Sequence, residues 1–193
     1  MRLKFLWPLG LLLAISGCVV QLPWAPDEVV QRAAYTHPGP SSVTLLSVVA
    51  NGTNSAGHTA LLINGSQRVI YDPAGTWYNK EVPERADLLY GITPKMLDYY
   101  VDYHARERFH VVMQTKTVPR EVADDLIARA IKLGASMNGM CAQNASTLLS
   151  QTSGLEGFPV SVWPKRAVAG MAAVPGVQIK KIYQTDKGKD LKE

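Results

Sequence analysis

Several common kinds of functional site are missing from this sequence of 193 residues. It has no His-Glu-x-x-His motif and no Cys-x-x-Cys pair, and its four histidines are scattered, so we expect no zinc or other metal site. It also lacks a phosphate-binding glycine loop and a Gly-x-Ser-x-Gly motif, which excludes the serine elbow of the α/β-hydrolases. We therefore expect a protein that works without a cofactor.

The chain also has little excess charge of either sign. Lys and Arg number 20 against 16 Asp and Glu, for a formal net charge of +4. No stripe of interleaved arginine and aromatic residues is present, so we expect no nucleic-acid partner. A mildly basic chain is better suited to an anionic membrane surface. Hydrophobic residues make up 47% of the sequence, which is enough for the packed core of one domain with appendages.

Cysteine is scarce, and one of the two cysteines belongs to a processing signal. Arg2 and Lys4 precede an apolar stretch, Phe5 to Ile15, that is too short to span a bilayer comfortably. The run Leu-Ala-Ile-Ser-Gly that ends at Cys18 resembles the bacterial lipobox. This predicts a signal peptide over residues 1–17 and a lipid on Cys18, which would become the mature N-terminus and anchor the chain to a membrane. The alternatives are an ordinary cleaved signal peptide and a short anchor helix.

The lipobox resemblance also predicts where the protein resides. The residue after Cys18 is Val19 and not aspartate, so nothing indicates retention at the inner membrane. We expect a bacterial cell-envelope lipoprotein, anchored by its lipid in the outer membrane and facing the periplasm.

The rest of the chain predicts one α+β domain, a small antiparallel sheet packed against helices. Residues 18–41 contain four prolines and are predicted to be a linker, residues 42–183 the domain, and residues 184–193 a charged tail. Asn64-Gly65 is a strong hairpin signal, and it makes the first three strands a meander. Residues 76–92 are predicted to be irregular. We expect strands at 43–49, 58–63, 68–72, 109–115 and 177–183, and helices at about 94–104, 119–133, 138–153 and 164–172.

Cys141 is the one cysteine left for chemistry. It lies near the predicted start of a helix, where Asn138 could cap the helix, and the N-terminal end of a helix favours a thiolate. A nucleophilic thiol needs a base and a group that orients the base. His58 begins one strand of the predicted hairpin and Asp72 ends the other, so the two residues should be neighbours.

Less specific interpretations stay open at this point. A buried cysteine is usually an inert packing residue, and a histidine at the start of a strand is often structural. Asp72 precedes a proline and could be a simple turn residue. His110, near the start of a later strand, is the alternative base, although Phe109 and Val111 flank it and no glycine precedes it.

Taken together, three motifs resemble the circularly permuted papain-like superfamily, the NlpC-related group that includes lecithin retinol acyltransferase-like proteins and bacterial lipoproteins. They are Gly57-His58-Thr59-Ala60, Tyr71-Asp72-Pro73, and Asn138-Gly139-Met140-Cys141-Ala142, within residues 42–155. In this group the histidine strand comes first, a polar residue follows on the next strand, and the cysteine comes last, on a helix. The resemblance implies Cys141 as nucleophile, His58 as general base and Asp72 as the orienting group.

The same resemblance implies an oxyanion hole that includes the backbone N–H of Cys141, with Asn138 and Tyr71 as candidates for its second donor. The expected activity is that of a membrane-anchored thiol hydrolase or acyltransferase acting on an amide, ester or thioester. The candidate substrates are cell-wall peptides and acyl lipids. The alternative is a non-catalytic envelope lipoprotein that uses the fold as a binding or assembly module.

Overall fold

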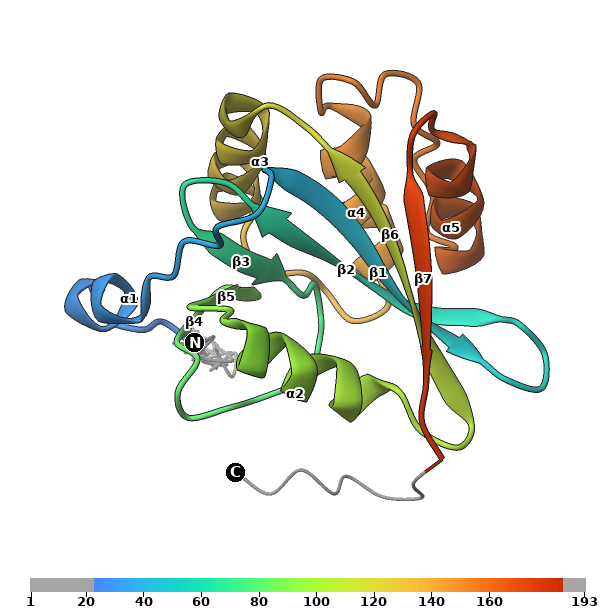
Figure 1. Ribbon diagram of the computed structural model, residues 1–193, viewed down its shortest axis with the longest axis horizontal. Coiled ribbons are helices and arrows are strands. Elements are labelled where there is room, and N and C mark those ends of the chain that lie inside the picture. The colour runs from blue at the N-terminus through green and yellow to red at the C-terminus, as the bar shows by residue number, and fades with distance from the viewer. Residues whose placement is uncertain (1–22, 186–193) are drawn as a thin grey trace, which may run out of the picture.

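The computed structural model describes residues 23–185 of the chain (Figure 1). The predicted signal peptide, the lipidation site Cys18 and nearly all of the charged tail lie outside the described residues. Within the described range, no helix combines the length and the apolar character that crossing a membrane requires.

A seven-stranded antiparallel sheet forms the centre of the molecule, with strand order β4-β5-β3-β2-β1-β6-β7. The first three strands along the chain are neighbours, as the hairpin signal predicts. The strands are β1 (Ser42–Ala50), β2 (Ala56–Asn64), β3 (Arg68–Tyr71), β4 (Glu84–Arg85), β5 (Leu88–Tyr90), β6 (Phe109–Thr117) and β7 (Gln178–Tyr183).

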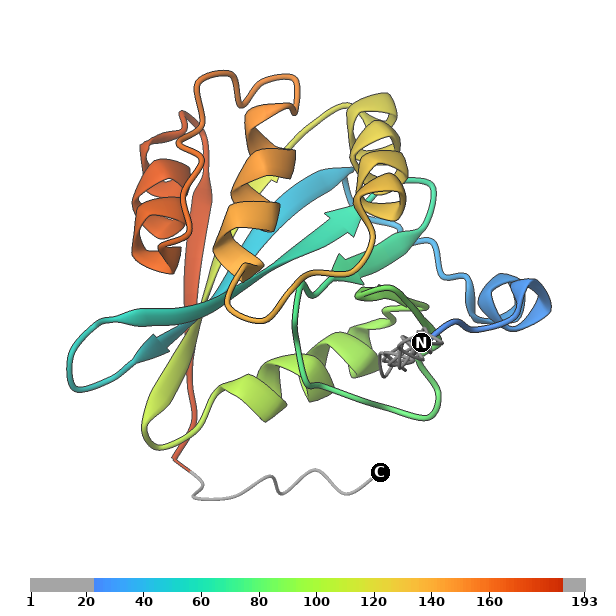
Figure 2. The ribbon, with the colours of Figure 1, turned by 180° about the vertical axis from the view of Figure 1, so that it is seen from behind.

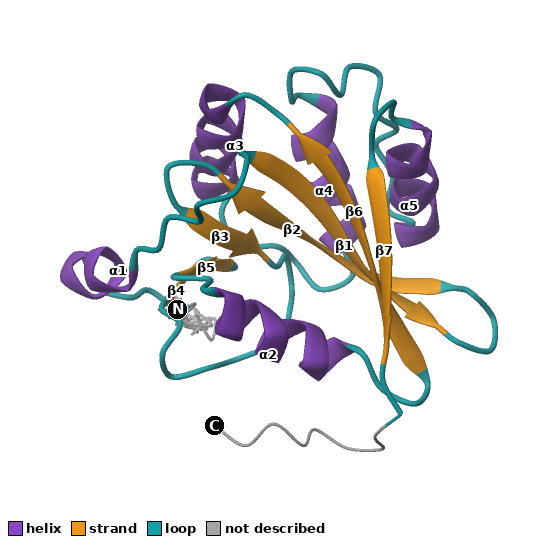
Figure 3. Cartoon of the chain, in the orientation of Figure 1, coloured by secondary structure: helices purple, strands orange, loops and turns teal. Residues whose placement is uncertain are grey.

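Helices cover both faces of the sheet, so the described part of the fold is α+β, as expected. On one face lie α3 (Arg120–Leu133), α4 (Cys141–Ser150) and α5 (Pro164–Ala173), and on the other α2 (Pro94–His104) (Figures 1 and 3). Alternate residues of β2 separate into two cores: Leu61 and Ile63 pack with the three helices, whereas Ala60 and Leu62 pack with α2. Each face of the central strands is therefore buried, which explains their continuous apolar runs.

Strand length and register leave one edge of β2 free where the candidate residues lie. Leu61 pairs with Tyr71, the last residue of β3, so the earlier part of β2 has no strand beside it on that side. On the other side, Val48 of β1 pairs with His58 and Val49 pairs with Ala56, so Gly57 is the extra residue of a β-bulge. Bulges bend a strand and re-aim its side chains, and this one directly precedes His58.

Segments predicted to be irregular turn out to have structure of their own. The predicted linker contains α1 (Asp27–Ala33), and Trp24 forms an isolated bridge with Arg85 of β4. The two short strands β4 and β5 lie within residues 76–92. Two- and three-residue strands give no period to detect, and α1 lacks buried residues, so neither carries the pattern on which the prediction depends.

Candidate functional site

His58 and Asp72 lie together at the free edge of β2. His58 Nε2 is 2.7 Å from Asp72 Oδ1, and the carboxylate is buried whereas the imidazole is partly exposed. The turn after β3 holds Asp72 in place, because the N–H of Gly75 donates to the Asp72 carbonyl. A β-carbon at Gly75 would overlap the Asp72 carboxylate, so the turn can wrap around Asp72 only because residue 75 is glycine.

Cys141 is the first residue of α4. Together with His58 and Asp72 it forms a group of three residues, the constellation. Its thiol lies close enough to the His58 ring and to the backbone N–H groups of Thr59 and Ala142 for all three to act on its pKa. Since Nε2 of His58 faces Asp72, Nδ1 is the nitrogen left for the thiol. Burial raises the pKa of Cys141, but the hydrogen bond and charge of His58 and the two backbone donors outweigh burial and lower the pKa below 9.0.

The pKa of His58 moves in the opposite direction. Burial lowers it, yet the hydrogen bonds and negative charges of Asp72 and Cys141 prevail and raise the pKa from 6.5 to about 10. Opposite shifts of this kind favour proton transfer from the thiol to the imidazole. Each of the two groups therefore favours the charged form of the other.

Two side chains of α2 complete the surroundings of His58. Tyr100 is buried near Asp72, and burial together with the negative charge of Asp72 raises the Tyr100 pKa well above 10.0. The His104 ring stacks on His58 with centroids 5.9 Å apart, and its Nδ1 is 2.8 Å from the Tyr100 carbonyl oxygen. Sequence reasoning did not place either residue at the site. They are four residues apart on one helical face, but nothing in the sequence shows that this face packs over His58.

Asp87 is a third residue that sequence reasoning missed. Its Oδ2 accepts hydrogen bonds from the N–H groups of Ala74 and Ser136, each at 2.8 Å. Its backbone carbonyl accepts from the N–H of Asp72 at 2.8 Å. One residue thus ties the turn that carries Asp72 to the loop that leads into Cys141, so it fixes the distance between the two halves of the constellation.

Replacing Asp87 should therefore destabilise the protein. We expect Asp87→Ala to lower the free energy of unfolding by about 3 kcal/mol, because two backbone donors lose a charged acceptor. Asp87→Asn should cost about 1 kcal/mol, since its amide oxygen can still accept and asparagine tolerates the positive φ of 69°. Urea unfolding followed by tryptophan fluorescence measures both. Asp125→Ala, which removes an exposed partner of Arg129, is the control, and an equal loss there would contradict the assignment.

Of the two candidates for a second oxyanion donor, Tyr71 is engaged in other hydrogen bonds and Asn138 is exposed in a turn. The buried Tyr71 hydroxyl donates to the Gly134 carbonyl at 2.9 Å and accepts from Asn144 Nδ2 at 3.3 Å, so it secures the two ends of the Cys141 loop. Burial raises its pKa to about 12, which keeps that proton in place. Asn138 lies exposed in a turn, and Met140, not Asn138, is the N-cap of α4, without a side-chain cap. The capping prediction was wrong because this turn delays the helix start to Cys141.

His110, the alternative base, makes its contacts away from these residues. It is buried on β6, with Nδ1 2.7 Å from Asn51 Oδ1, and its ring stacks on Tyr183 at 4.5 Å. The structure therefore gathers His58, Asp72 and Cys141 and gives His110 a structural environment.

Among the described residues, one group of side chains has metal-ligand geometry. Ligand atoms of His58, Asp72 and His104 all lie within 4.8 Å of one another. The 2.7 Å contact between His58 and Asp72 is that of a charge-assisted hydrogen bond, and the His58 ring also bonds the thiol. Asp72 thus already engages Nε2 of His58, and the other side of the ring acts on the thiol, so we assign the group to proton chemistry.

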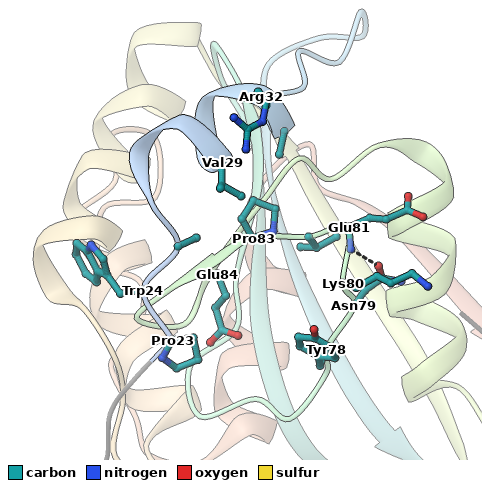
Figure 4. Close-up of a pocket in the computed structure, with 13 residues that line it drawn as sticks. Pro23, Trp24, Val29, Arg32, Tyr78, Asn79, Lys80, Glu81, Pro83 and Glu84 are labelled. Carbon is teal, nitrogen blue, oxygen red and sulfur yellow. Dashed lines mark hydrogen bonds between the residues drawn. The ribbon is translucent and has the colours of Figure 1, made fainter.

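A pocket of about 630 Å³ lies between the N-terminal segment and the loop before β4 (Figure 4). Pro23 and Trp24 line it from one side and Tyr78 from the other, and Glu84 extends into it. Burial raises the pKa of Glu84, and the negative charges of Asp87 and Asp72 raise it further. Glu84 pairs with Leu89 of β5, and the neighbouring Leu88 pairs with Tyr71, so the pocket lies on the Asp72 side of the constellation.

The comparisons with known proteins give no relative. No family model matches the chain, and neither a curated protein nor a solved structure is significantly similar to it. The arrangement of the side chains is thus the basis for assigning a function.

Proposed function

We propose that this chain is a thiol-dependent hydrolase or acyltransferase with a circularly permuted papain-like fold. The observation that carries the proposal is the 2.7 Å contact between Asp72 and His58, together with the mutual influence of His58 and the Cys141 thiol, at the start of a helix, on each other's pKa. A nucleophile, a base that bonds it and a carboxylate that orients the base are the parts that covalent acyl transfer requires.

The reaction follows from the protonation states. The Cys141 thiolate attacks the carbonyl carbon of an amide, ester or thioester, and the backbone N–H of Cys141 stabilises the developing oxyanion. His58 gives its proton to the departing amine, alcohol or thiol, and an acyl-thioester forms on Cys141. His58 then takes a proton from water or another acceptor, which attacks the thioester and releases the acyl group and the thiolate. Asp72 holds the imidazole in position and stabilises its charged form throughout.

The cell-envelope setting extends this proposal. A lipid on Cys18 would hold the domain at the outer membrane, facing the periplasm, within reach of cell-wall peptides and acyl lipids as substrates. The short tether between Cys18 and the first described residue, Pro23, would keep the domain close to the bilayer surface.

Trapping the acyl-enzyme tests the proposal. The purified domain, incubated with p-nitrophenyl acetate and quenched in acid, should gain one acetyl group on the peptide that contains Cys141, together with a burst of p-nitrophenol. Mass spectrometry of the digest identifies the site. A thiol that stays unmodified, or acetylation confined to surface lysines, would favour the non-catalytic binding module instead.

A further inference from the structure

A second cavity lies on the other side of the constellation, between the β1–β2 hairpin and the first turn of α5. It measures about 580 Å³. Its wall consists of Ser55 and Ala56 on β2 and its hairpin, and of residues 163–166 and 169 on and before α5. Helices α4 and α5 pack side by side, and their N-terminal ends point toward this same end of β2 (Figure 2). The cavity and the start of α4, where Cys141 is the first residue, therefore lie toward the same end of β2.

The path along β2 from this cavity to the site is open. Ala56 lines the cavity, and His58 is two residues further, about 6–7 Å along a strand. Gly57, the bulge residue between them, has no side chain, and a β-carbon built there meets no atom within 4 Å. The stretch of β2 between the cavity and His58 therefore offers free space beside Gly57 that a substrate could occupy.

The lining of the cavity is apolar and carries charge of only one sign. Trp163, Pro164, Ala56 and Ala169 give it apolar walls, and Trp163 is 68% exposed. Lys165 and Arg166 are its only charged residues, and both are exposed. The wall of the pocket on the Asp72 side, in contrast, carries both signs of charge, from Arg32, Lys80, Glu81 and Glu84.

The backbone adds to the positive charge. Pro164 and Lys165 form the first turn of α5, and no side chain caps this end of the helix. The partial positive charge of an uncapped helix end favours an anion near it. The cations, the helix end and the apolar walls fit one kind of occupant, an apolar segment that ends in an anionic group.

We propose that this cavity is the subsite for the part of the substrate that extends from the reacting carbonyl, and that it selects substrates with a carboxylate or phosphate attached to an apolar segment. This inference rests on the proposed thiol chemistry at Cys141 and deepens it. The planar guanidinium of Arg166 presents paired N–H donors that match a carboxylate or phosphate. Lys165 supplies a second positive charge, and Trp163 covers the apolar segment.

A pair of esters of equal length tests this selectivity. We expect the wild-type domain to prefer mono-p-nitrophenyl adipate over p-nitrophenyl hexanoate, and the double variant Lys165→Glu/Arg166→Glu to lower the ratio of their kcat/KM values about tenfold. The control Lys180→Glu/Lys181→Glu makes the same change in net charge on β7 and should leave the ratio unchanged. A ratio that does not move, or that moves equally in the control, overturns the proposal. A third ester, which ends in a phosphonate, distinguishes the two anions: the anionic ester with the higher kcat/KM carries the group that the cavity prefers.

A second variant tests the path. Gly57→Leu fills the open space beside the bulge, so it should lower kcat/KM for the two six-carbon esters about tenfold more than for p-nitrophenyl acetate. An equal effect on long and short esters would mean that substrates do not extend past Gly57.

An alkylation measurement separates failure of this inference from failure of the proposed function. Iodoacetate and iodoacetamide differ only in charge, and both modify Cys141 without turnover. At low salt, the charge reversal at 165 and 166 should lower the ratio of iodoacetate to iodoacetamide rates about threefold. An altered alkylation ratio in a protein that hydrolyses no ester would refute the enzyme proposal but retain the anion-selective cavity. An unaltered ratio in an active enzyme would refute the cavity alone.

Discussion

Replacing His58 with alanine is expected to lower kcat/KM for ester hydrolysis by about 10³–10⁴-fold. The variant loses the group that lowers the Cys141 pKa through a hydrogen bond and a charge, so less thiolate is present at neutral pH. It also loses the acid that protonates the leaving group. Alkylation by iodoacetamide should slow as well, because only the thiolate reacts.

Removing a different histidine provides the matched control for this experiment. His110→Ala deletes the same side chain from the same sheet, but His110 bonds Asn51 and stacks on Tyr183 away from Cys141. We expect its kcat/KM to stay within about threefold of the wild type. Cys141→Ala, which lacks the nucleophile, gives the background rate of ester hydrolysis. If His110→Ala were as inactive as His58→Ala, the choice of base would be wrong. If both stayed active, neither histidine would be the base and the role proposed for His58 would be wrong.

The part of the site that could be predicted is the part that follows from local strand geometry. A hairpin turn at Asn64-Gly65 fixes which residues of two adjacent strands are neighbours, and it brings the start of β2 beside the end of β3. His58 and Asp72 lie at those two ends, and the 2.7 Å contact agrees with that expectation. The main helices were predictable for a similar reason, since Pro94, Pro119 and Pro164 lie at or next to helix starts and apolar periodicity marks the buried faces.

The rest of the site depends on contacts between segments distant in the sequence. Asp87 is 49 residues from Ser136 along the chain, and no period or motif joins them. Tyr100 and His104 reach Asp72 and His58 only because α2 packs on that face of the sheet. The bulge at Gly57 arises from a mismatch between β1 and β2 that becomes visible only in their register. Tertiary packing, which single-sequence patterns do not encode, positions these groups.

The pH dependence of activity provides a test of Asp72. The reactive form is the thiolate–imidazolium pair, so activity should rise as Cys141 ionises, at a pH lower than its ordinary pKa of 9.0, and fall when His58 loses its proton near pH 10. The wild type should therefore be active between the pH at which Cys141 ionises and the pH, about 10, at which His58 loses its proton. Because the two groups interact strongly, the ascending and descending limbs of the pH–activity profile report apparent pKa values of the pair.

Asp72→Asn should lower the pH at which activity falls on the alkaline side, and so narrow the pH range of activity. The variant loses the negative charge and the carboxylate acceptor that raise the His58 pKa, so the descending limb should move down toward 6.5. With less imidazolium present, kcat/KM at pH 7 should fall by about 10²–10⁴-fold. The control is Asp125→Asn, which neutralises an exposed carboxylate paired with Arg129 and should leave both limbs in place. A descending limb that stays near pH 10 in Asp72→Asn would show that another group sets the charge of His58. The stacked His104 could not be that group, because burial lowers its own pKa and a neutral imidazole cannot stabilise a neighbouring imidazolium by charge.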